Sequence, residues 1–218
     1  MLTIFCATNV PPVLIGSVRD LRAVWAAEEL NLPYKIEWLD AKAGEHRADW
    51  FREYSAFLKF PAINDGGVKL FESAAIVAYL ADKARRMIPP PGALERSEHD
   101  QWIYAALNTL EPSVFNVFLC DTFWREMAGV GAFRAAFLAT ARDRLQSLDM
   151  VLSKTAYLTG DDFQACDIVM AHVLGFIRDD AILEGLEHLI SYRDRCFARA
   201  AYQKALAIQT AGKPAGAG

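Results

Sequence analysis

The sequence predicts an α/β domain followed by an all-helical domain, and three observations support this division. In the first part, a strand–helix–strand crossover precedes a hairpin, which implies a mixed sheet with helices on its faces. A proline-rich segment at residues 85–94 then interrupts the pattern, because consecutive prolines cannot continue a helix. Beyond it the sequence shows helical periodicity and no convincing strand.

The first half begins with an apolar run at residues 2–6, which predicts a strand that enters a loop with two prolines. Residues 17–31 keep helical spacing of apolar side chains, and Pro33 stops the helix. A second strand is expected at residues 34–39, and a shorter helix at 45–54.

A hairpin and a helix complete this half. Asp65-Gly66-Gly67 is a hairpin turn signal, because glycine accepts the positive φ that short hairpin turns require. The returning strand is expected at residues 68–71. Ser73 is predicted to cap a helix over residues 74–85.

The second half reads as a set of amphipathic helices. They are expected at residues 95–127 (bent at Pro112), 132–152, 167–176, 183–189 and 192–209. The predicted organisation is therefore a first domain at 1–84, a linker at 85–94, a helical domain at 95–210 and a flexible tail at 211–218.

Composition excludes several classes of protein. The chain has 218 residues, a formal net charge of −4 and no basic run, which argues against nucleic acid as a partner. No stretch is apolar and long enough to span a membrane, and the N-terminus lacks the basic region of a signal peptide, so the cytoplasm is the expected location. The cysteines and histidines are scattered, so neither a disulfide framework nor a metal site is expected.

Residues 59–83 carry the chemistry. Pro61 has no N–H, so it interrupts the strand ladder where its strand begins and leaves neighbouring backbone groups for a partner. Glu72 and Ser73 lie where helix amides and the helix dipole favour a ligand carboxylate, with an acid beside them for an ammonium group. A short peptide with a free α-amino acid end satisfies both features.

This segment closely resembles the glutathione site of the cytosolic glutathione transferases, here of a bacterial type with a serine active site. The resemblance implies a thioredoxin-like first domain and a cis-proline at Pro61, after Phe60, that pairs with the cysteinyl backbone of glutathione. It also implies that Glu72 and Ser73 hold the γ-glutamyl end, and that Lys59 lies near the glycine carboxylate. An ordinary turn and an ordinary helix cap are the structural alternatives.

The second half resembles the helical domain of the same family. Residues 160–168 are similar to its folding signature, a capping box that opens a buried helix, with Asp167 as the acid that bonds back to the first turn. Gln164 stands where the family has Ser or Thr, and glutamine is a poorer cap. These departures concern stability rather than chemistry.

An enzyme that uses glutathione must stabilise a negative charge on sulfur, because only the thiolate is a good nucleophile. Counted back from the family's first-helix motif at residues 26–30, Ser17 coincides with the catalytic serine of the serine-type classes. Ser17 as a simple helix cap is the alternative. Arg19 and Cys6 are secondary candidates, Arg19 as a cation beside the thiolate and Cys6 as a mixed-disulfide nucleophile.

An electrophile pocket is expected along the first long helix of the second half, with Tyr104 and Asn108 as its candidates. The aromatic residues that follow on this helix are either pocket or core; they are Phe115, Phe118, Phe123 and Trp124. The resemblance also implies a homodimer.

Three functions remain open at this point. The first is a glutathione transferase of the detoxification kind, which conjugates the glutathione thiolate to a small apolar electrophile and needs no metal. The second is a glutathione-dependent reductase of disulfides or peroxides, in which Cys6 or bound glutathione does the redox work. The third is a protein of the same fold that only binds, because fold does not settle function.

Overall fold

A computed structural model of the chain describes residues 1–212. By their contacts, these residues form two compact units. The first unit comprises Met1–Arg86 together with the chain from Arg199 onward, and the second comprises Met87–Ala198. The predicted domain boundaries stay a prediction, but the contacts assign the last helix to the first unit.

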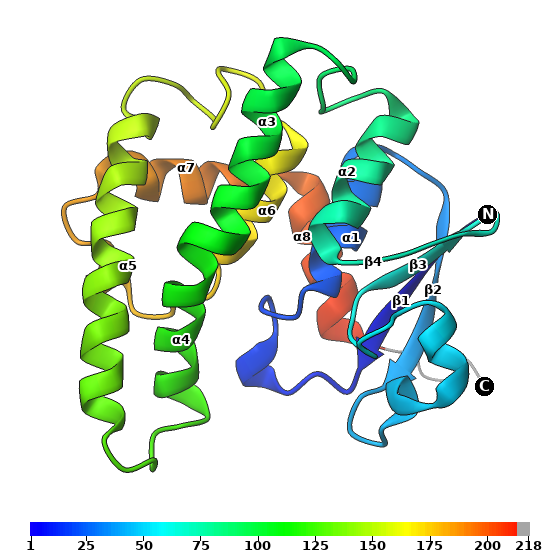
Figure 1. The fold of residues 1–218 in the computed structure, drawn as a ribbon, viewed down its shortest axis with the longest axis horizontal. Helices are drawn as coiled ribbons and strands as arrows, with labels where there is room; N and C mark the ends of the chain where they lie inside the picture. Colours follow the sequence, from blue (N-terminus) through cyan, green and yellow to red (C-terminus); the bar gives the residue numbers. More distant parts are fainter. Residues whose placement is uncertain (213–218) are drawn as a thin grey trace. The chain divides into compact units, whose positions relative to one another are not determined.

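The first unit is built on a mixed sheet (Figure 1). Its strands are β1 (Leu2–Thr8), β2 (Tyr34–Asp40), β3 (Ala62–Asp65) and β4 (Val68–Phe71), in the order β2-β1-β3-β4. β1 is parallel to β2 and antiparallel to β3, and β3 is antiparallel to β4. The crossover and the hairpin expected from the sequence are therefore confirmed.

The turn between β3 and β4 is made by Gly66 and Gly67, whose φ angles are 61° and 101°. Asp65 pairs with Val68 across this two-residue turn. Side chains other than glycine rarely adopt positive φ, so the turn requires both glycines.

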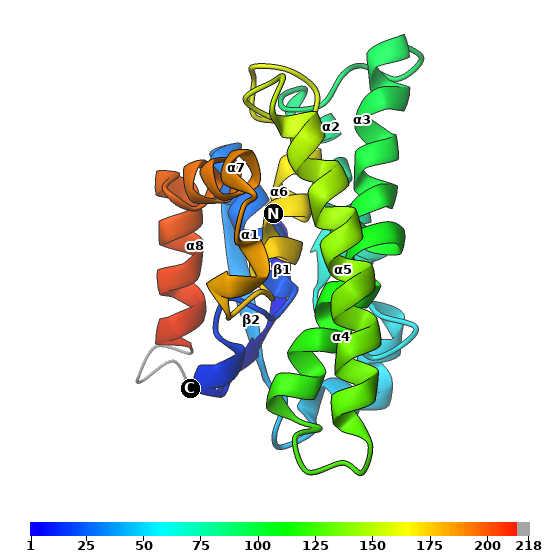
Figure 2. The same cartoon turned by 90° about the vertical axis from the view of Figure 1, so that its left-hand side faces the viewer.

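Helices cover one face of the sheet. α1 (Asp20–Glu29) contacts β1, α2 (Ser73–Ala84) contacts β3 and β4, and the two helices contact each other. α8 (Ala200–Ala211) lies along α1 (Figure 2). Trp25 of α1 is fully buried there, with its ring 4.8 Å from that of Tyr202.

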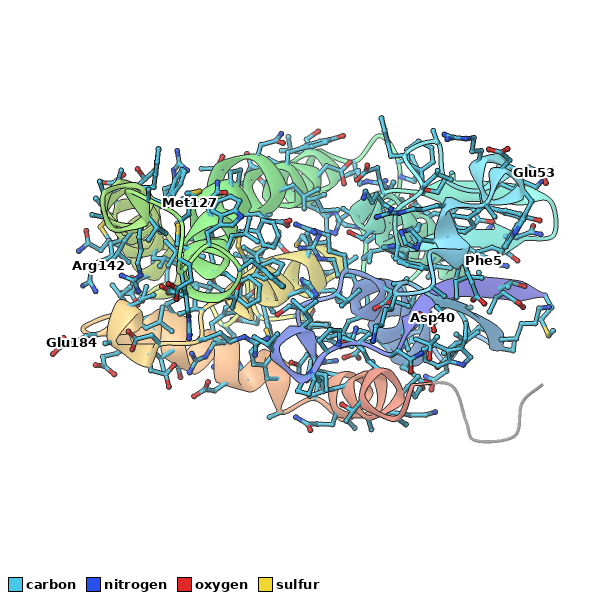
Figure 3. The ribbon with its side chains drawn as sticks, turned by 90° about the horizontal axis from the view of Figure 1, so that it is seen from below. Phe5, Asp40, Glu53, Met127, Arg142 and Glu184 are labelled. Atoms are coloured by element: carbon cyan, nitrogen blue, oxygen red, sulfur yellow. The ribbon has the colours of Figure 1, made fainter. Side chains whose placement is uncertain are left out.

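The other face of the sheet is covered by two short 3-10 helices, η2 (Glu45–Arg47) and η3 (Asp49–Glu53). The single helix expected at residues 45–54 is wrong, because Ala48 is extended (ψ 143°) and separates the two turns. Phe51 of η3 is fully buried against Phe5, which Figure 3 labels.

The described part of the second unit consists of helices, turns and one isolated β-bridge. Its α-helices are α3 (Leu94–Tyr104), α4 (Glu111–Thr122), α5 (Val130–Leu152), α6 (Ala165–Leu174) and α7 (Glu187–Phe197). The all-helical second half is thus confirmed for the segment between the linker and Ala198. Among residues 1–212, no helix has the length and apolarity to cross a membrane.

A π-helical turn, η4 (Ala105–Leu110), joins α3 to α4. The N–H of Glu111 donates to the carbonyl of Ala106, which is the wider π spacing. Pro112 follows directly; it has no N–H, and its ring would clash with the carbonyl four residues earlier in a regular α-helix. The bend expected at Pro112 is therefore taken up by the π turn before it.

The last part of the chain differs from the expected helices at 183–189 and 192–209. The structure has a 3-10 turn, η5 (Asp180–Leu183), and then α7, which ends at Phe197. Arg199 is extended (ψ 135°) and its guanidinium pairs with Glu29 of α1 at 2.5 and 2.8 Å, so α7 and α8 are two helices rather than one. In the second unit, Arg142 of α5 holds η5 by donating to carbonyls that include that of Glu184 (Figure 3).

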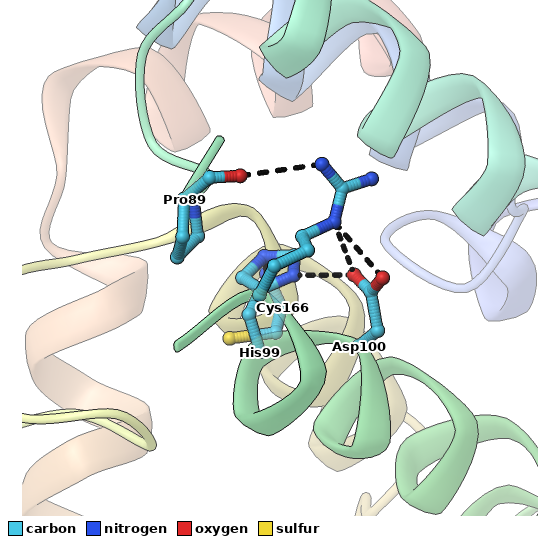
Figure 4. Close-up of polar contacts among 5 residues, drawn as sticks. Pro89, His99, Asp100 and Cys166 are labelled. Atoms are coloured by element: carbon cyan, nitrogen blue, oxygen red, sulfur yellow. Dashed lines mark hydrogen bonds and ion pairs between the residues drawn. The ribbon is translucent and has the colours of Figure 1, made fainter. Parts of the chain in front are cut away.

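The start of α6 is capped from two sides. Asp167 accepts the N–H of Gln164 at 2.8 Å and so completes its part of the expected capping box. From α3, Nε2 of the buried His99 accepts the N–H of Cys166 at 3.1 Å, while its Nδ1 lies 2.9 Å from Asp100 (Figure 4). The helix begins where both interactions satisfy amides that lack intrahelical partners.

Candidate functional site

The loop before β3 places Lys59, Phe60 and Pro61 at one end of the sheet. The Phe60–Pro61 peptide bond is cis, and Pro61 is buried directly before β3 begins at Ala62. The hydroxyl of Ser55 ties the loop together, because it accepts the Lys59 N–H and donates to the Lys59 carbonyl, both at 3.0 Å. Since Pro61 has no N–H, this end of the strand presents backbone groups that a peptide can meet.

The start of α2 holds Glu72 and Ser73. Ser73 was expected to cap this helix, and the structure corrects that: Ser73 is its first residue, and Glu72 occupies the cap position without a capping bond from its side chain. Glu72 is exposed and has a φ of 70°, a sparsely populated conformation for a residue with a Cβ. The first N–H groups of a helix lack intrahelical partners and favour an anion.

Arg22 of α1 adds a buried cation to this helix start. Its side chain is fully buried, and Nη1 donates to Oγ of Ser73 at 3.0 Å. Because the Ser73 hydroxyl accepts this bond, its own hydrogen can be donated to another acceptor. The guanidinium also adds a permanent positive charge to the helix dipole. The start of α2 is therefore suited to one carboxylate group of a ligand.

Ser17 lies in the loop between β1 and α1 and is only 5% exposed. Its N–H donates to the Leu14 carbonyl at 2.8 Å, after Gly16 has taken a φ of 80°. The helix expected to begin at Ser17 begins at Asp20, with Arg19 in the cap position. Ser17 thus belongs to a tightly turned loop rather than to the helix.

Strand pairing brings these segments together within the first unit. Phe5 of β1 pairs with Ala62 of β3 in an antiparallel register, so the loop that follows β1 and the loop that precedes β3 leave the sheet at the same end. The Arg22–Ser73 hydrogen bond joins α1 to the start of α2. Pairing thus places the two loops at one end of the sheet, and the hydrogen bond ties α1 to the helix start that carries Glu72 and Ser73.

His46 of η2 is a further polar residue beside this loop, and sequence reasoning missed it. Its ring centroid lies 5.2 Å from that of Phe60, it is only 7% exposed, and its Nδ1 has no hydrogen-bond partner among residues 1–212. Burial lowers the pKa of the imidazole, and the charges of Arg47 and Lys59 lower it further. In the sequence, Gly44 indicated a turn at this point: its left-handed conformation begins η2, which contains His46.

Comparison with known proteins identifies the family. The model of the glutathione S-transferase N-terminal domain matches residues 21–83, which span α1 to α2. Glutathione S-transferase F10 of Arabidopsis thaliana is 26% identical over 193 residues, covering 84% of this chain and 89% of the relative. Glutathione S-transferase theta-1 of the rat is 31% identical over 163 residues, 68% of this chain and 65% of the relative. The chain belongs to the glutathione transferase superfamily.

Solved structures agree with this transferase fold. A glutathione transferase from Pseudomonas putida, with one glutathione disulfide bound per subunit, has a TM-score of 0.79 and 20% sequence identity. The match covers 95% of this chain and 91% of that one. The thioredoxin-like first half and the helical second half are those of glutathione transferases, and the protein is an enzyme of this class.

Cys6 is poorly suited to redox chemistry in this transferase. It lies within β1 and is only 3% exposed, beside Asp20 of α1. Burial, and to a smaller extent the Asp20 carboxylate, raise the pKa of the Cys6 thiol well above its ordinary value. A thiol in this setting stays protonated at neutral pH, whereas attack requires the thiolate. Arg19, by contrast, is only half-buried and follows Ser17 closely.

Tyr104 and Asn108 belong to the second unit. Tyr104 ends α3 and is 64% exposed, and Asn108 follows one turn later in η4, also exposed. Of the aromatic stripe beyond them, Phe118 is core at 2% exposed, and its ring lies 6.1 Å from that of Phe115, which is half-buried like Trp124. Phe123 is exposed instead.

The part of the chain that the structure describes contains no cluster of side chains arranged to ligate a metal ion. Within residues 1–212, no group of three or more histidine, cysteine, aspartate or glutamate side chains is placed to hold an ion. The polar groups at the start of α2 are donors and one exposed acid, a set suited to an amino acid end rather than to a cation.

Proposed function

We propose that this transferase joins the thiolate of glutathione to a small apolar electrophile, with Ser17 donating a hydrogen bond to the sulfur. The observation that carries the proposal is the contact of Arg22 with Ser73, which gives the start of α2 a buried cation, helix amides and a hydroxyl donor. Together these groups neutralise and orient one carboxylate. The Pseudomonas putida relative with bound glutathione disulfide supports this class of ligand.

Each part of glutathione has a proposed place in the first unit. The γ-glutamyl carboxylate lies at Ser73 and its ammonium at Glu72, while the cysteinyl backbone runs along Phe60 and Pro61. The glycine carboxylate then reaches Lys59 and His46, whose ring lies beside Phe60. The peptide thus extends from a helix start, along the free end of β3, to a basic loop.

The chemistry follows from the state of the thiol. A free thiol has a pKa near ~8.5, so little thiolate exists at neutral pH. A hydroxyl that donates a hydrogen bond to the sulfur stabilises the negative charge of the thiolate. The thiol therefore gives up its proton to water more readily. The thiolate then forms the new bond to carbon of the electrophile, and the bond from that carbon to the leaving group breaks with its electron pair, so that an aryl halide releases halide ion. Ser17 is the proposed donor, and the positive charge of Arg19 can stabilise the same thiolate.

Tyr104 and Asn108 are the proposed contacts of the electrophile, because both are exposed and adjacent on one helical face.

A homodimer is also proposed. Large apolar side chains stay exposed on α5, among them Phe133 at 54% and Met150 at 65%, and a partner subunit can cover them. Sedimentation equilibrium tests this, and a single species of 24.2 kDa at micromolar concentration would exclude the dimer. The cytoplasmic location stays a prediction.

The Ser17→Ala variant tests the mechanism. We expect kcat for conjugation of an aryl halide to fall about tenfold to a hundredfold, because a hydrogen bond to a charged group is lost. The dissociation constant of glutathione should change little, since the carboxylate contacts stay in place. Ser147→Ala, an exposed serine of α5, is the matched control. Unchanged turnover in Ser17→Ala removes Ser17 from the mechanism.

Two other functions give different results in the same assays. A reductase that depends on Cys6 would lose disulfide reduction in Cys6→Ser, whereas burial of this thiol leads us to expect no loss. A protein that only binds would be retained on immobilised glutathione and would show no turnover with any electrophile tested.

A further inference from the structure

The side chain of Gln209, near the end of α8, is bonded to the backbone on both sides of Ser17. Its Oε1 accepts the N–H of Gly16 at 2.7 Å, and its Nε2 donates to the carbonyl of Val18 at 3.2 Å. Gln209 is only 5% exposed. The last helix of the chain is therefore hydrogen-bonded to the loop that contains Ser17, although almost the whole sequence separates the two.

Asp20 fixes which way the Gln209 amide points. Oδ1 of Asp20 accepts the Gln209 Nε2–H at 2.7 Å, while Oδ2 accepts the N–H of Ala7 at the end of β1, at 2.8 Å. An ionised carboxylate only accepts hydrogen bonds, so the NH₂ group of Gln209 must face Asp20 and its oxygen must face Gly16. These hydrogen bonds join five residues in one network, in which Ala7, Asp20 and Gln209 are buried.

On the side that faces Cys6, the network leaves no room for a ligand. The cavity beside Cys6, Asp20 and Gln209 has a volume of about 10 Å³, which is no more than the space for one water molecule. Gln209 also borders a larger cavity of about 360 Å³ beside the end of β1. Both hydrogens of its NH₂ group are already donated, to Val18 and Asp20, and its oxygen accepts from Gly16, so this amide serves to hold backbone in place. The backbone it holds is that of the Ser17 loop.

From this geometry we infer that Gln209 is a positioning residue, which sets the place of the Ser17 hydroxyl against the glutathione sulfur. The inference rests on the proposed function. Gly16 has a φ of 80°, and the loop also contains Pro11 and Pro12, so its turns depend on such anchors. A displacement of about 1 Å in a catalytic group can lower the rate by about a hundredfold. The proposed carboxylate contacts at Ser73, by contrast, involve no hydrogen bond to Gln209.

The first experiment removes the anchor with Gln209→Leu, which keeps the size of the side chain. We expect kcat to fall about tenfold to a hundredfold, while the KM for glutathione stays within about twofold. Ultraviolet absorbance of the bound thiolate, followed against pH, should show a higher pKa of the glutathione thiol than in the unchanged enzyme. Gln203→Leu, an exposed glutamine on the same helix, is the matched control and should keep all three properties.

The second experiment tests the contact itself by exchanging its polarity. Gln209→Glu places two carboxylates face to face in a buried site, and we expect loss of turnover or of folding. Adding Asp20→Asn restores a bond, because the amide now donates to the carboxylate at position 209, and its oxygen still accepts from Ala7. The new carboxylate also accepts from Gly16. We therefore expect the double variant to recover at least about tenfold in kcat over Gln209→Glu.

The outcomes separate this inference from the proposed function. If the unchanged enzyme neither binds nor conjugates glutathione, the proposed function fails. If Ser17→Ala lowers kcat but folded Gln209→Leu keeps the kcat and the thiol pKa of the unchanged enzyme, the positioning role is wrong. It is equally wrong if the double variant is no better than Gln209→Glu. A parallel rise of KM with unchanged kcat would assign Gln209 to binding instead, and would also overturn it.

Discussion

Arg22 and Ser73 are separated in the chain by a strand and a hairpin, yet one hydrogen bond joins them at the proposed carboxylate site. The spacing of residues 59–83 predicted the helix start and its Glu72-Ser73 pair, because capping and dipole effects are local. It could not predict Arg22, whose guanidinium reaches Ser73 only after α1 and α2 have packed together. A buried arginine and a surface arginine look the same in sequence.

Arg22→Met should weaken glutathione binding by about tenfold or more, because the carboxylate loses a charge-assisted environment. Methionine keeps much of the side-chain length, and calorimetric titration of glutathione gives the affinity. Ser73→Ala, which keeps the buried charge but removes the hydroxyl, should lower affinity less. Circular dichroism shows whether Arg22→Met folds. If both variants fold and bind glutathione as tightly as the unchanged enzyme does, the proposed carboxylate site is contradicted.

Asp20 makes the stability of the fold depend on pH. Burial raises the pKa of the Asp20 carboxyl from 3.8 to about 6, against the lowering effect of the hydrogen bonds from Ala7, Gln209 and Leu21. The folded protein therefore holds this proton more tightly than the unfolded chain does. Stability must then fall as the pH rises between about 4 and about 6.

The expected contribution is on the order of 3 kcal/mol, which follows from the size of the pKa difference. Urea unfolding at a series of pH values measures it, and Asp20→Asn should flatten the curve in this window. Asp161→Asn, an exposed aspartate, should leave it unchanged. A curve of the same slope in the unchanged protein and in Asp20→Asn would refute the assignment.

Helix boundaries show which elements a local pattern can predict. The hairpin with Gly66 and Gly67 was predicted correctly, because its turn chemistry is local. The helix expected at 192–209 was not, since the break at Arg199 depends on a partner, Glu29, in a distant helix. The helix expected at 45–54 failed for a related reason: Phe51 is drawn into the core under β1, and the backbone at Ala48 extends to allow it.

The start of α6 depends on Asp167, which is fully buried and accepts three hydrogen bonds. They come from the N–H groups of Leu158 and Gln164 and from the hydroxyl of Tyr192, at 3.1, 2.8 and 2.9 Å. Asp167→Asn should lower the free energy of unfolding by on the order of 3 kcal/mol, because an amide offers one acceptor where three donors meet. Chemical denaturation measures this, with Asp162→Asn, exposed in the preceding loop, as control. A loss below about 0.5 kcal/mol would show that the cap is dispensable.

On the scale of the whole chain, the division into an α/β part and a helical part followed from the proline-rich linker and the change of periodicity. Neither of these features predicted that α8 packs with the first unit. An amphipathic helix shows that one of its faces is buried, but it does not show which element covers that face. For the same reason Gln209 gave no signal in the sequence, although it is bonded on both sides of Ser17.

A crystal structure of the enzyme with glutathione at saturating concentration tests the proposed site most directly. We expect the γ-glutamyl carboxylate on Ser73 and the amides of α2, the cysteinyl backbone beside Pro61, and the sulfur within hydrogen-bonding distance of the Ser17 hydroxyl. A structure in which this site stays empty, or in which the sulfur meets no group of the loop between β1 and α1, would contradict it.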